Sequence, residues 1–231
     1  MRSCRNFRSW RRPVGDHGAT CPARRFQYGS APFQIVGELV RRKLAARGDK
    51  AGPLAYIDRR IFWSIGIAPV QWRRSADGNP LMAAGAALTA RQWARFGEFV
   101  RLGGKWEGSQ LVDPATLAGL FQGSSANPAY GASWWLAVPV PEAERPRQLR
   151  NAVDLAGSAQ DFPRGIVLAV GKGRQRLAVV PSENLVIVRQ TDNRKSGEAG
   201  EGGGVEAGAP DLNDGRWSDT QFLKLALGIK P

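Results

Sequence analysis

Residues 173–189, GRQRLAVVPSENLVIVR, decide the fold class of this chain. Two apolar runs within them, Gln175–Val179 and Leu185–Arg189, have the composition and length of strands. The four residues between these runs, Pro-Ser-Glu-Asn, are typical of a tight turn. A hairpin pairs its two strands antiparallel, so the sequence predicts an antiparallel sheet in this part of the chain.

A well-signalled helix precedes this hairpin. Thr89 and Gln92 have the spacing of a capping box, and Leu88 and Trp93 have the spacing of a hydrophobic staple. The pair Gly103-Gly104 supplies a stop signal. Both devices recur before a last helix, which we expect to end at Gly228. The residues are Ser218 with Gln221 for the box and Trp217 with Phe222 for the staple.

Two further helices are indicated by a capping residue followed by proline. Ser30 can cap a helix that has Pro32 in its first turn and closes near Gly48. Asp113 precedes Pro114 at the first position of another helix. Further strands are predicted over 133–140 and 165–170. Helices, then strands, then a helix predict an α+β fold, in which helices are segregated from an antiparallel sheet.

The chain divides into a tail and one domain. Residues 1–25 mix Arg, Pro, Gly and Ser without apolar periodicity, so we expect a disordered basic tail; the alternative is that this stretch is not native coding sequence. Residues 26–231 form the domain. Within it, residues 192–215 are rich in Gly, Glu and Ala, which predicts a flexible insertion before the last helix.

The charge of the chain is high but dispersed. The net charge is +13, and residues 1–25 hold seven arginines against one aspartate. The remaining excess shows no dense cluster, so we predict no specific nucleic-acid surface, while nonspecific attraction to phosphate stays open. No apolar run is long enough to span a bilayer, and no signal peptide is visible. The compartment is therefore left unknown.

Cysteine and histidine usage predicts no metal site and no cofactor. Cys4, Cys21 and the single histidine, His17, all lie in the tail, and a structural zinc site needs four such ligands. Residues 171–176, GKGRQR, lack the third glycine of a dinucleotide-binding fingerprint and open no helix.

Three places are candidates for chemistry, each with a plainer alternative. Tyr28 precedes the helix cap at Ser30, and a phenol there can act as a general base if a cation lowers its pKa from about 10. The alternative is a half-buried tyrosine that packs on the helix start, with Ser30 acting only as a cap. From local sequence alone, this alternative is favoured.

The second place is Gly171-Lys172-Gly173, which we expect to open a strand. Glycines there permit close approach of a substrate backbone, and the lysine can hold a carboxylate. A tight turn with a solvated lysine explains the same residues. The third place is Trp134-Trp135, which can line a cleft but is explained as readily by core packing.

Taken together and in order, these segments resemble the serine β-lactamase-related superfamily. This superfamily includes class C β-lactamases, D-Ala-D-Ala carboxypeptidases, lactamase-like esterases and nylon-oligomer hydrolases. Four segments, spread over residues 26–227, carry the resemblance. Phe26–Leu44 resembles the segment with the Y-x-N or Y-x-S motif, residues 84–104 resemble its "lTarDlarfG…gG" helix, YGASWW at 130–135 resembles its "YGlgWw" strand, and residues 173–189 resemble its "GgQrl.vdP…lvvv" hairpin.

The resemblance implies roles for the candidate residues. Tyr28 and Ser30 take the positions of the tyrosine motif, and Gly171, Lys172 and Gly173 take the place of the K-T-G element, whose hydroxyl residue is absent here. The family's catalytic serine and lysine lie upstream on an S-x-x-K helix start. No lysine of this sequence has a serine three residues before it. The resemblance therefore implies a β-lactamase-like fold that lacks its N-terminal part.

Two functional hypotheses follow. The first is a β-lactamase-type serine hydrolase for amide or ester carbonyls, present here as a truncated chain without its nucleophile and inactive alone. The second is a non-catalytic remnant or a basic binding protein. Truncation of the sheet would also leave an unpaired edge, so we expect poor solubility or self-association. A sharp, reversible thermal transition of a monomer would count against this expectation. Relatives are often exported, which leaves the compartment undecided.

Overall fold

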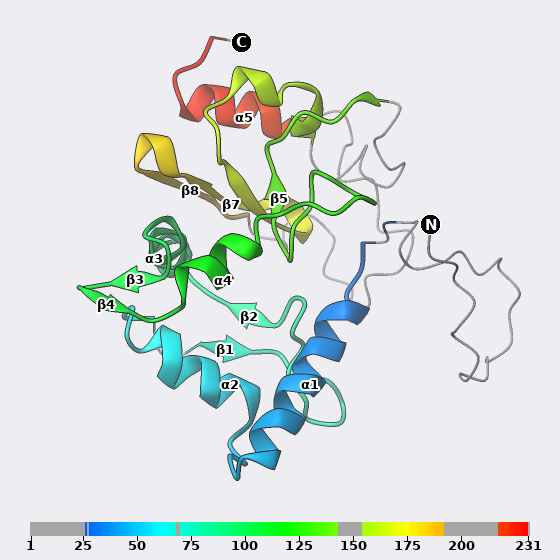
Figure 1. The fold of residues 1–231 in the computed structure, drawn as a ribbon, viewed down its shortest axis with the longest axis vertical. Coiled ribbons are helices and arrows are strands. Elements are labelled where there is room, and N and C mark those ends of the chain that lie inside the picture. Colours follow the sequence, from blue (N-terminus) through cyan, green and yellow to red (C-terminus); the bar gives the residue numbers. More distant parts are fainter. Residues whose placement is uncertain (1–25, 27, 68–69, 143–153, 192–216, 231) are drawn as a thin grey trace, which may run out of the picture.

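The computed structural model describes residues 26, 28–67, 70–142, 154–191 and 217–230. A four-stranded antiparallel sheet with the strand order β5-β6-β7-β8 forms one half of the molecule, and α1 and α2 lie in the other half (Figure 1). The strands are β5 (Trp135–Leu136), β6 (Val167–Gly171), β7 (Gln175–Val180) and β8 (Leu185–Arg189). Short 3₁₀ turns lie before and between them, at Asp154–Gly157, Ala159–Asp161, Lys172–Arg174 and Pro181–Glu183. The predicted α+β class and the hairpin at 175–189 are confirmed.

The two faces of the sheet pack against different helices. On β7, Ala178 and Val180 join a core cluster with Leu223 of α5 (Asp219–Ala226). The alternate residues Leu177 and Val179 join a second cluster with α3 (Ala90–Arg101). This alternation follows from the two-residue period of a strand, so a strand that is apolar at every position is covered on both faces.

Helix α3 lies close against the sheet because it has a glycine at the contact. A Cβ added at Gly97 would lie 2.5 Å from Val186 Cγ1 and 2.7 Å from Leu177 Cδ1. Any larger side chain would push the helix away from β7 and β8. The sheet is thereby held between α3 and α5, with apolar side chains on each side.

Three of the four predicted helix caps are present. The Thr89 side chain accepts from Gln92 N, and the Gln92 side chain accepts from Thr89 N, which completes the capping box of α3. Asp113 caps α4 (Pro114–Gly119), and Ser218 caps α5. The staple of α5 is also formed, because the rings of Trp217 and Phe222 are 5.1 Å apart.

The predicted cap at Ser30 is wrong, although the helix it precedes, α1 (Ala31–Ala46), is present. Ser30 already has a helical backbone (φ −80°, ψ −25°), and its side chain makes no capping bond. A side-chain cap needs an extended backbone at that residue. Instead, the backbone carbonyl of Ser30 accepts from the amides of Phe33 and Gln34.

The strand predicted over 133–140 is limited to β5. Ser133 has a positive φ of 76°, so the chain turns there, and an isolated bridge joins Tyr130 to Trp135. The sequence also gave no sign of several short elements. They are α2 (Gly52–Ile57), the π-helical turn Asp58–Phe62, β1 (Gln71–Trp72), β2 (Ala86–Ala87), β3 (Lys105–Trp106) and β4 (Ser109–Gln110). Phe62, Ile65 and Ile67 from this region form a third core cluster with Phe99 of α3.

Helix α1 is apolar on two opposite faces, and only one of them is packed. Gly37 lies against Met82 and Leu44 is buried. On the other face, Ile35, Val36 and Leu39 are 62%, 55% and 52% exposed. We call these three residues the α1 stripe. A surface helix normally places polar residues on its outward side.

Two expectations concern parts of the chain that the structure does not describe. The basic tail (1–25) and the insertion (192–215) lie outside the described residues, so both stay predictions. Strands β5 and β8 are the outer strands of the four-stranded sheet, and self-association at such an edge likewise stays a prediction. Among the described residues, no helix is long and apolar enough to cross a membrane.

Candidate functional site

Tyr28 lies in a group of four aromatic rings where α1 meets the sheet. Its ring centroid is 5.8 Å from that of Tyr130 and 5.6 Å from that of Trp135. Phe26 contacts the same two rings, at 5.1 Å and 6.3 Å. We call Phe26, Tyr28, Tyr130 and Trp135 the aromatic cluster. Tyr28 itself is 40% exposed, so one side of its ring is open to solvent.

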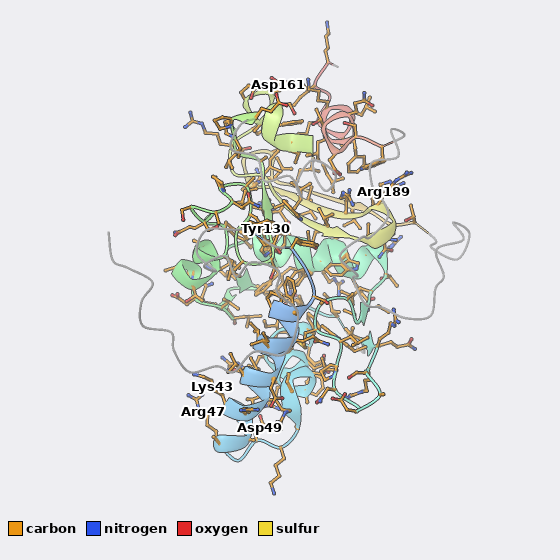
Figure 2. The ribbon with its side chains drawn as sticks, turned by 90° about the vertical axis from the view of Figure 1, so that its right-hand side faces the viewer. Lys43, Arg47, Asp49, Tyr130, Asp161 and Arg189 are labelled. Carbon is orange, nitrogen blue, oxygen red and sulfur yellow. The ribbon has the colours of Figure 1, made fainter. Side chains whose placement is uncertain are left out.

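The aromatic cluster lies on the face of the sheet that α5 covers. Trp135 belongs to the same core cluster as Leu168, Ala178 and Leu223, and Phe26 and Tyr130 pack against that cluster. Figure 2 shows Tyr130 beside the first turn of α1, at the junction with the sheet. Trp135, whose ring Tyr28 contacts, pairs with Leu168 of β6, the strand that ends at Gly171.

The Gly171-Lys172-Gly173 element lies in the turn between β6 and β7, and it does not open a strand as expected. Gly171 is the last residue of β6 and pairs with Gln175, the first residue of β7. Lys172–Arg174 form the turn, in which Gly173 (φ 70°) and Arg174 (φ 60°) both have left-handed backbones. Glycine adopts this conformation without strain, so the tight-turn interpretation explains Gly173 fully.

The tryptophan pair is divided between the two faces of the sheet. Trp134 is 6% exposed and contacts Phe121 on the α3 side, while Trp135 is 3% exposed and lies on the α5 side. Adjacent residues of a strand point to opposite faces, so the two indoles cannot line one cleft together. Core packing accounts for Trp134, and Trp135 supports the aromatic cluster.

Sequence reasoning missed a buried ion pair next to the aromatic cluster. Arg176 of β7 donates to Asp219 of α5 through two bonds, Nε to Oδ1 at 2.5 Å and Nη2 to Oδ2 at 3.0 Å. Their side chains are only 1% and 4% exposed. Trp217 Nε1 also donates to Asp219 Oδ1, and the Arg189 guanidinium lies 4.2 Å from the centroid of the Trp217 ring.

A signal for this pair was present in the strand pattern. Arg176 occupies the same face of β7 as Ala178 and Val180, which are both buried. A charged residue on the buried face of a strand is uncommon unless it has a partner. The pattern could have flagged Arg176, but nothing local identifies Asp219, which lies 43 residues further along the chain.

The electrostatics of the site leave Tyr28 neutral at ordinary pH. Burial raises the pKa of Tyr28 above its usual value of 10.0, and the positive charge of Arg176 acts in the opposite direction. Burial also raises the pKa of Tyr130, and the neighbouring Tyr28 phenolate would raise it further. A phenol that is to act as a base near neutral pH needs its ionised form stabilised by more positive charge than Arg176 alone supplies.

Other features of the described residues do not add to this site. A cavity of about 280 Å³ lies between the end of α1 and the start of α2, and no candidate residue lines it. Its lining includes Asp49, and Figure 2 places Lys43, Arg47 and Asp49 at the end of α1 opposite Tyr130. In the described part of the chain, no group of three or more His, Cys, Asp or Glu side chains could hold a metal ion.

Two solved structures share this fold. A Bacillus anthracis protein provisionally assigned as a 6-aminohexanoate-dimer hydrolase has a TM-score of 0.55 and 18% identity over 78% of this chain. A Bacteroides dorei protein provisionally assigned as a β-lactamase has a TM-score of 0.51 and 15% identity over 77% of this chain. This chain has the serine β-lactamase fold over the matched part.

The match covers only part of each solved structure. The chain spans 43% of the Bacillus anthracis protein and 54% of the Bacteroides dorei protein. No family model and no curated protein matches the sequence. The shared fold agrees with the resemblance that the four sequence segments carry, while identities this low establish the fold alone.

Proposed function

We propose that these residues form the tyrosine-bearing part of a β-lactamase-type serine hydrolase site, which acts on an amide or ester carbonyl. In this proposal Tyr28 is the general base that assists a serine nucleophile, and Gly171, Lys172 and Gly173 border the substrate. Ser30, two residues after Tyr28, completes the tyrosine motif in this proposal. The observation that carries the proposal is the position of Tyr28 over Trp135, whose strand pairs with the strand leading to Gly171.

The serine–lysine pair of such a site is not among these 231 residues, since no lysine has a serine three positions before it. We therefore propose that the 231 residues alone do not turn over substrate. The raised pKa of Tyr28 supports this view, because an additional cation is needed before the phenol can accept a proton. A lysine next to the serine would supply that cation.

The exposed α1 stripe supports the same proposal. Ile35 lies about one turn into α1, which begins three residues after Tyr28, and its apolar neighbours Val36 and Leu39 continue the surface along the helix. A serine–lysine segment that reaches Tyr28 must pack beside α1. An apolar surface there supplies the burial that such packing needs.

Two measurements test the proposal. The 231-residue chain, incubated with a chromogenic β-lactam and with a p-nitrophenyl ester, should release no stoichiometric burst of product. A burst would overturn the claim of inactivity. The DNA upstream of the codon for Phe26 should then be read in all three frames for a segment that encodes S-x-x-K.

If such a segment is found, its fusion in frame ahead of Phe26 should produce turnover. In that fusion, Tyr28→Phe should lower kcat by about 10²- to 10⁴-fold, the range for loss of a general base. Tyr56→Phe is the matched control, because Tyr56 lies on α2 outside the aromatic cluster, and it should leave kcat unchanged. Equal effects of the two substitutions would overturn the role of Tyr28.

The alternative function is a non-catalytic remnant or a basic binding protein, for which the net charge of +13 is the motivating observation. The upstream reading separates the two candidates. An S-x-x-K segment in any frame favours the hydrolase, whereas none in any frame favours the remnant.

A further inference from the structure

Arg176 occupies the same face of the sheet as the aromatic cluster. Trp135 pairs with Leu168, which pairs with Ala178, and the next same-face pair along these strands is Val170 with Arg176. Directly paired residues point to the same side of a sheet, and residues two apart on one strand do so as well. Arg176 therefore lies on the same face of the sheet as Trp135, which Tyr28 contacts, two strands across and two residues along.

The guanidinium of Arg176 is fixed at every nitrogen. Nε and Nη2 donate to the two oxygens of Asp219, and Nη1 donates to the backbone oxygen of Gln175 at 3.0 Å. The Trp217 ring lies 6.0 Å from its central carbon. Asp219 is the first residue of α5. The positive charge thus has one position and is nearly excluded from water.

Stability alone is a weak reason for such a pair. A buried ion pair exchanged for apolar side chains of similar volume is often neutral or stabilising, because desolvation offsets the attraction between the charges. Arg189 lies against the same tryptophan, and Arg176 and Arg174, after burial itself, lower the pKa of Arg189. Among the described charges that act on Arg189, Arg174 and Arg176 are positive and Asp219 is negative.

We propose that Arg176 is a positioning residue of the Tyr28 site: Asp219 holds it on the sheet, and its fixed charge favours the ionised form of the Tyr28 phenol. The catalytic meaning of this role rests on the proposed function. Arg176 does not touch the substrate, and it acts by offsetting the desolvation of Tyr28. The opposing effects of burial and of Arg176 on the pKa of Tyr28 agree with this assignment.

The described charged and titratable groups considered around the Tyr28 site come from several elements. Tyr130 contributes a second phenol from the loop before β5, and its own pKa is raised by burial. Arg176 comes from β7 and Arg189 from β8, and Asp219 comes from α5. Only Asp219 is negative in this set, so its removal and the removal of Arg176 must move the Tyr28 phenol in opposite directions.

The test is a tyrosine titration of the intact 231-residue chain, which needs no substrate and no turnover. The chain has three tyrosines, so the signal of Tyr28 is assigned by its loss in Tyr28→Phe. Carbon-13 labelling at tyrosine Cζ gives the pKa of each phenol by NMR. Tryptophan fluorescence at each pH confirms that the fold persists.

We expect Arg176→Met to raise the pKa of Tyr28 and Asp219→Asn to lower it. Arg176→Lys, which keeps the charge, should stay closer to the unsubstituted chain than Arg176→Met does. If the pair served only to hold α5, both Arg176→Met and Asp219→Asn would expose Tyr28 and move its pKa down toward 10. A downward or absent shift in folded Arg176→Met therefore overturns the proposal.

A double substitution protects the test against loss of folding. Arg176→Met combined with Asp219→Leu removes both charges and leaves an apolar contact, which proteins often tolerate. The pKa of Tyr28 should rise in this variant too, and a fall overturns the proposal. Arg59→Gln is the matched control, because it removes an arginine that lies 5.3 Å from a tyrosine ring outside the aromatic cluster, and it should leave the pKa of Tyr28 unchanged. The titration can fail while the hydrolase assay succeeds, and the reverse, so the two proposals are separable.

Discussion

The sheet half and helix α1 differ in how completely they bury their apolar residues. Strand β7 is apolar on both faces from Leu177 to Val180, and α3 and α5 cover those faces so that none of these side chains is more than 3% exposed. Helix α1 is also apolar on two faces, but the α1 stripe remains more than half exposed. The same kind of sequence pattern therefore leads to a closed core in one region and an open surface in the other.

The difference identifies the α1 stripe as an exposed apolar surface of the described residues. An apolar helix face of three large side chains is unusual on a surface that only meets water. The α1 stripe begins near Tyr28, and the proposed function requires a serine–lysine segment to pack there. Under that proposal, the sheet half would support Tyr28 and Arg176, and the α1 stripe would be the surface on which the segment packs.

The largest expected effect concerns the ion pair that joins α5 to the sheet. Asp219→Ala leaves Arg176 as an unpaired buried cation, which should lower the free energy of unfolding by about 3–5 kcal/mol. The matched control is Asp161→Ala, which removes the other described ion pair of α5, between Lys224 Nζ and Asp161 Oδ2 at 2.9 Å. Asp161 is 39% exposed, so its loss should cost about 0–1 kcal/mol. Urea denaturation measures the free energy of unfolding of both variants. Equal losses in the two variants would show that α5 is not held by the buried pair.

The next prediction compares the two regions directly by truncating one leucine in each. Leu168 is fully buried between β5 and β7, so Leu168→Ala should cost about 2–5 kcal/mol through lost contacts and a residual cavity. Leu39→Ala on the α1 stripe should change stability by no more than about 0.5 kcal/mol, because its side chain is already 52% exposed. Denaturation midpoints of the two variants decide the point. A large loss for Leu39→Ala would mean that the α1 stripe is covered in solution.

The parts of the fold that could be predicted from the sequence are those with local signals. The hairpin at 175–189 and the caps at Thr89, Asp113 and Ser218 each depend on residues within a few positions of one another. Strands β1 to β4 have two residues each, which is too short to show an alternation of apolar and polar residues. The pairing of β1 with β2 joins residues that are separated by a long loop, such as Gln71 and Ala87, whereas β3 and β4 form a tight hairpin around Glu107-Gly108.

The candidate site likewise contains some residues that the local sequence identified and others that it could not identify. Tyr28 and the Gly171–Gly173 turn were singled out by motif, but the sequence could not show which neighbours would surround them. The aromatic cluster gathers Phe26, Tyr130 and Trp135 through tertiary packing, and Arg176 is fixed by a residue of the last helix. Ser30 shows the opposite error, because its spacing suggested a cap that its helical backbone does not allow.

The smallest expected effect comes from a comparison of Thr89 and Ser30, the two hydroxyl residues that precede α3 and α1. Thr89 accepts from Gln92 N at 3.2 Å, so Thr89→Ala should lower the free energy of unfolding by about 1 kcal/mol. Ser30→Ala should cost much less, since the Ser30 hydroxyl makes no capping bond and the helix start is held by its backbone carbonyl. Urea denaturation of the two variants gives the comparison, and circular dichroism checks that helix content is unchanged. A loss for Ser30→Ala as large as that for Thr89→Ala would show that the cap forms in solution, and the local sequence rule would then apply to α1 as it does to α3.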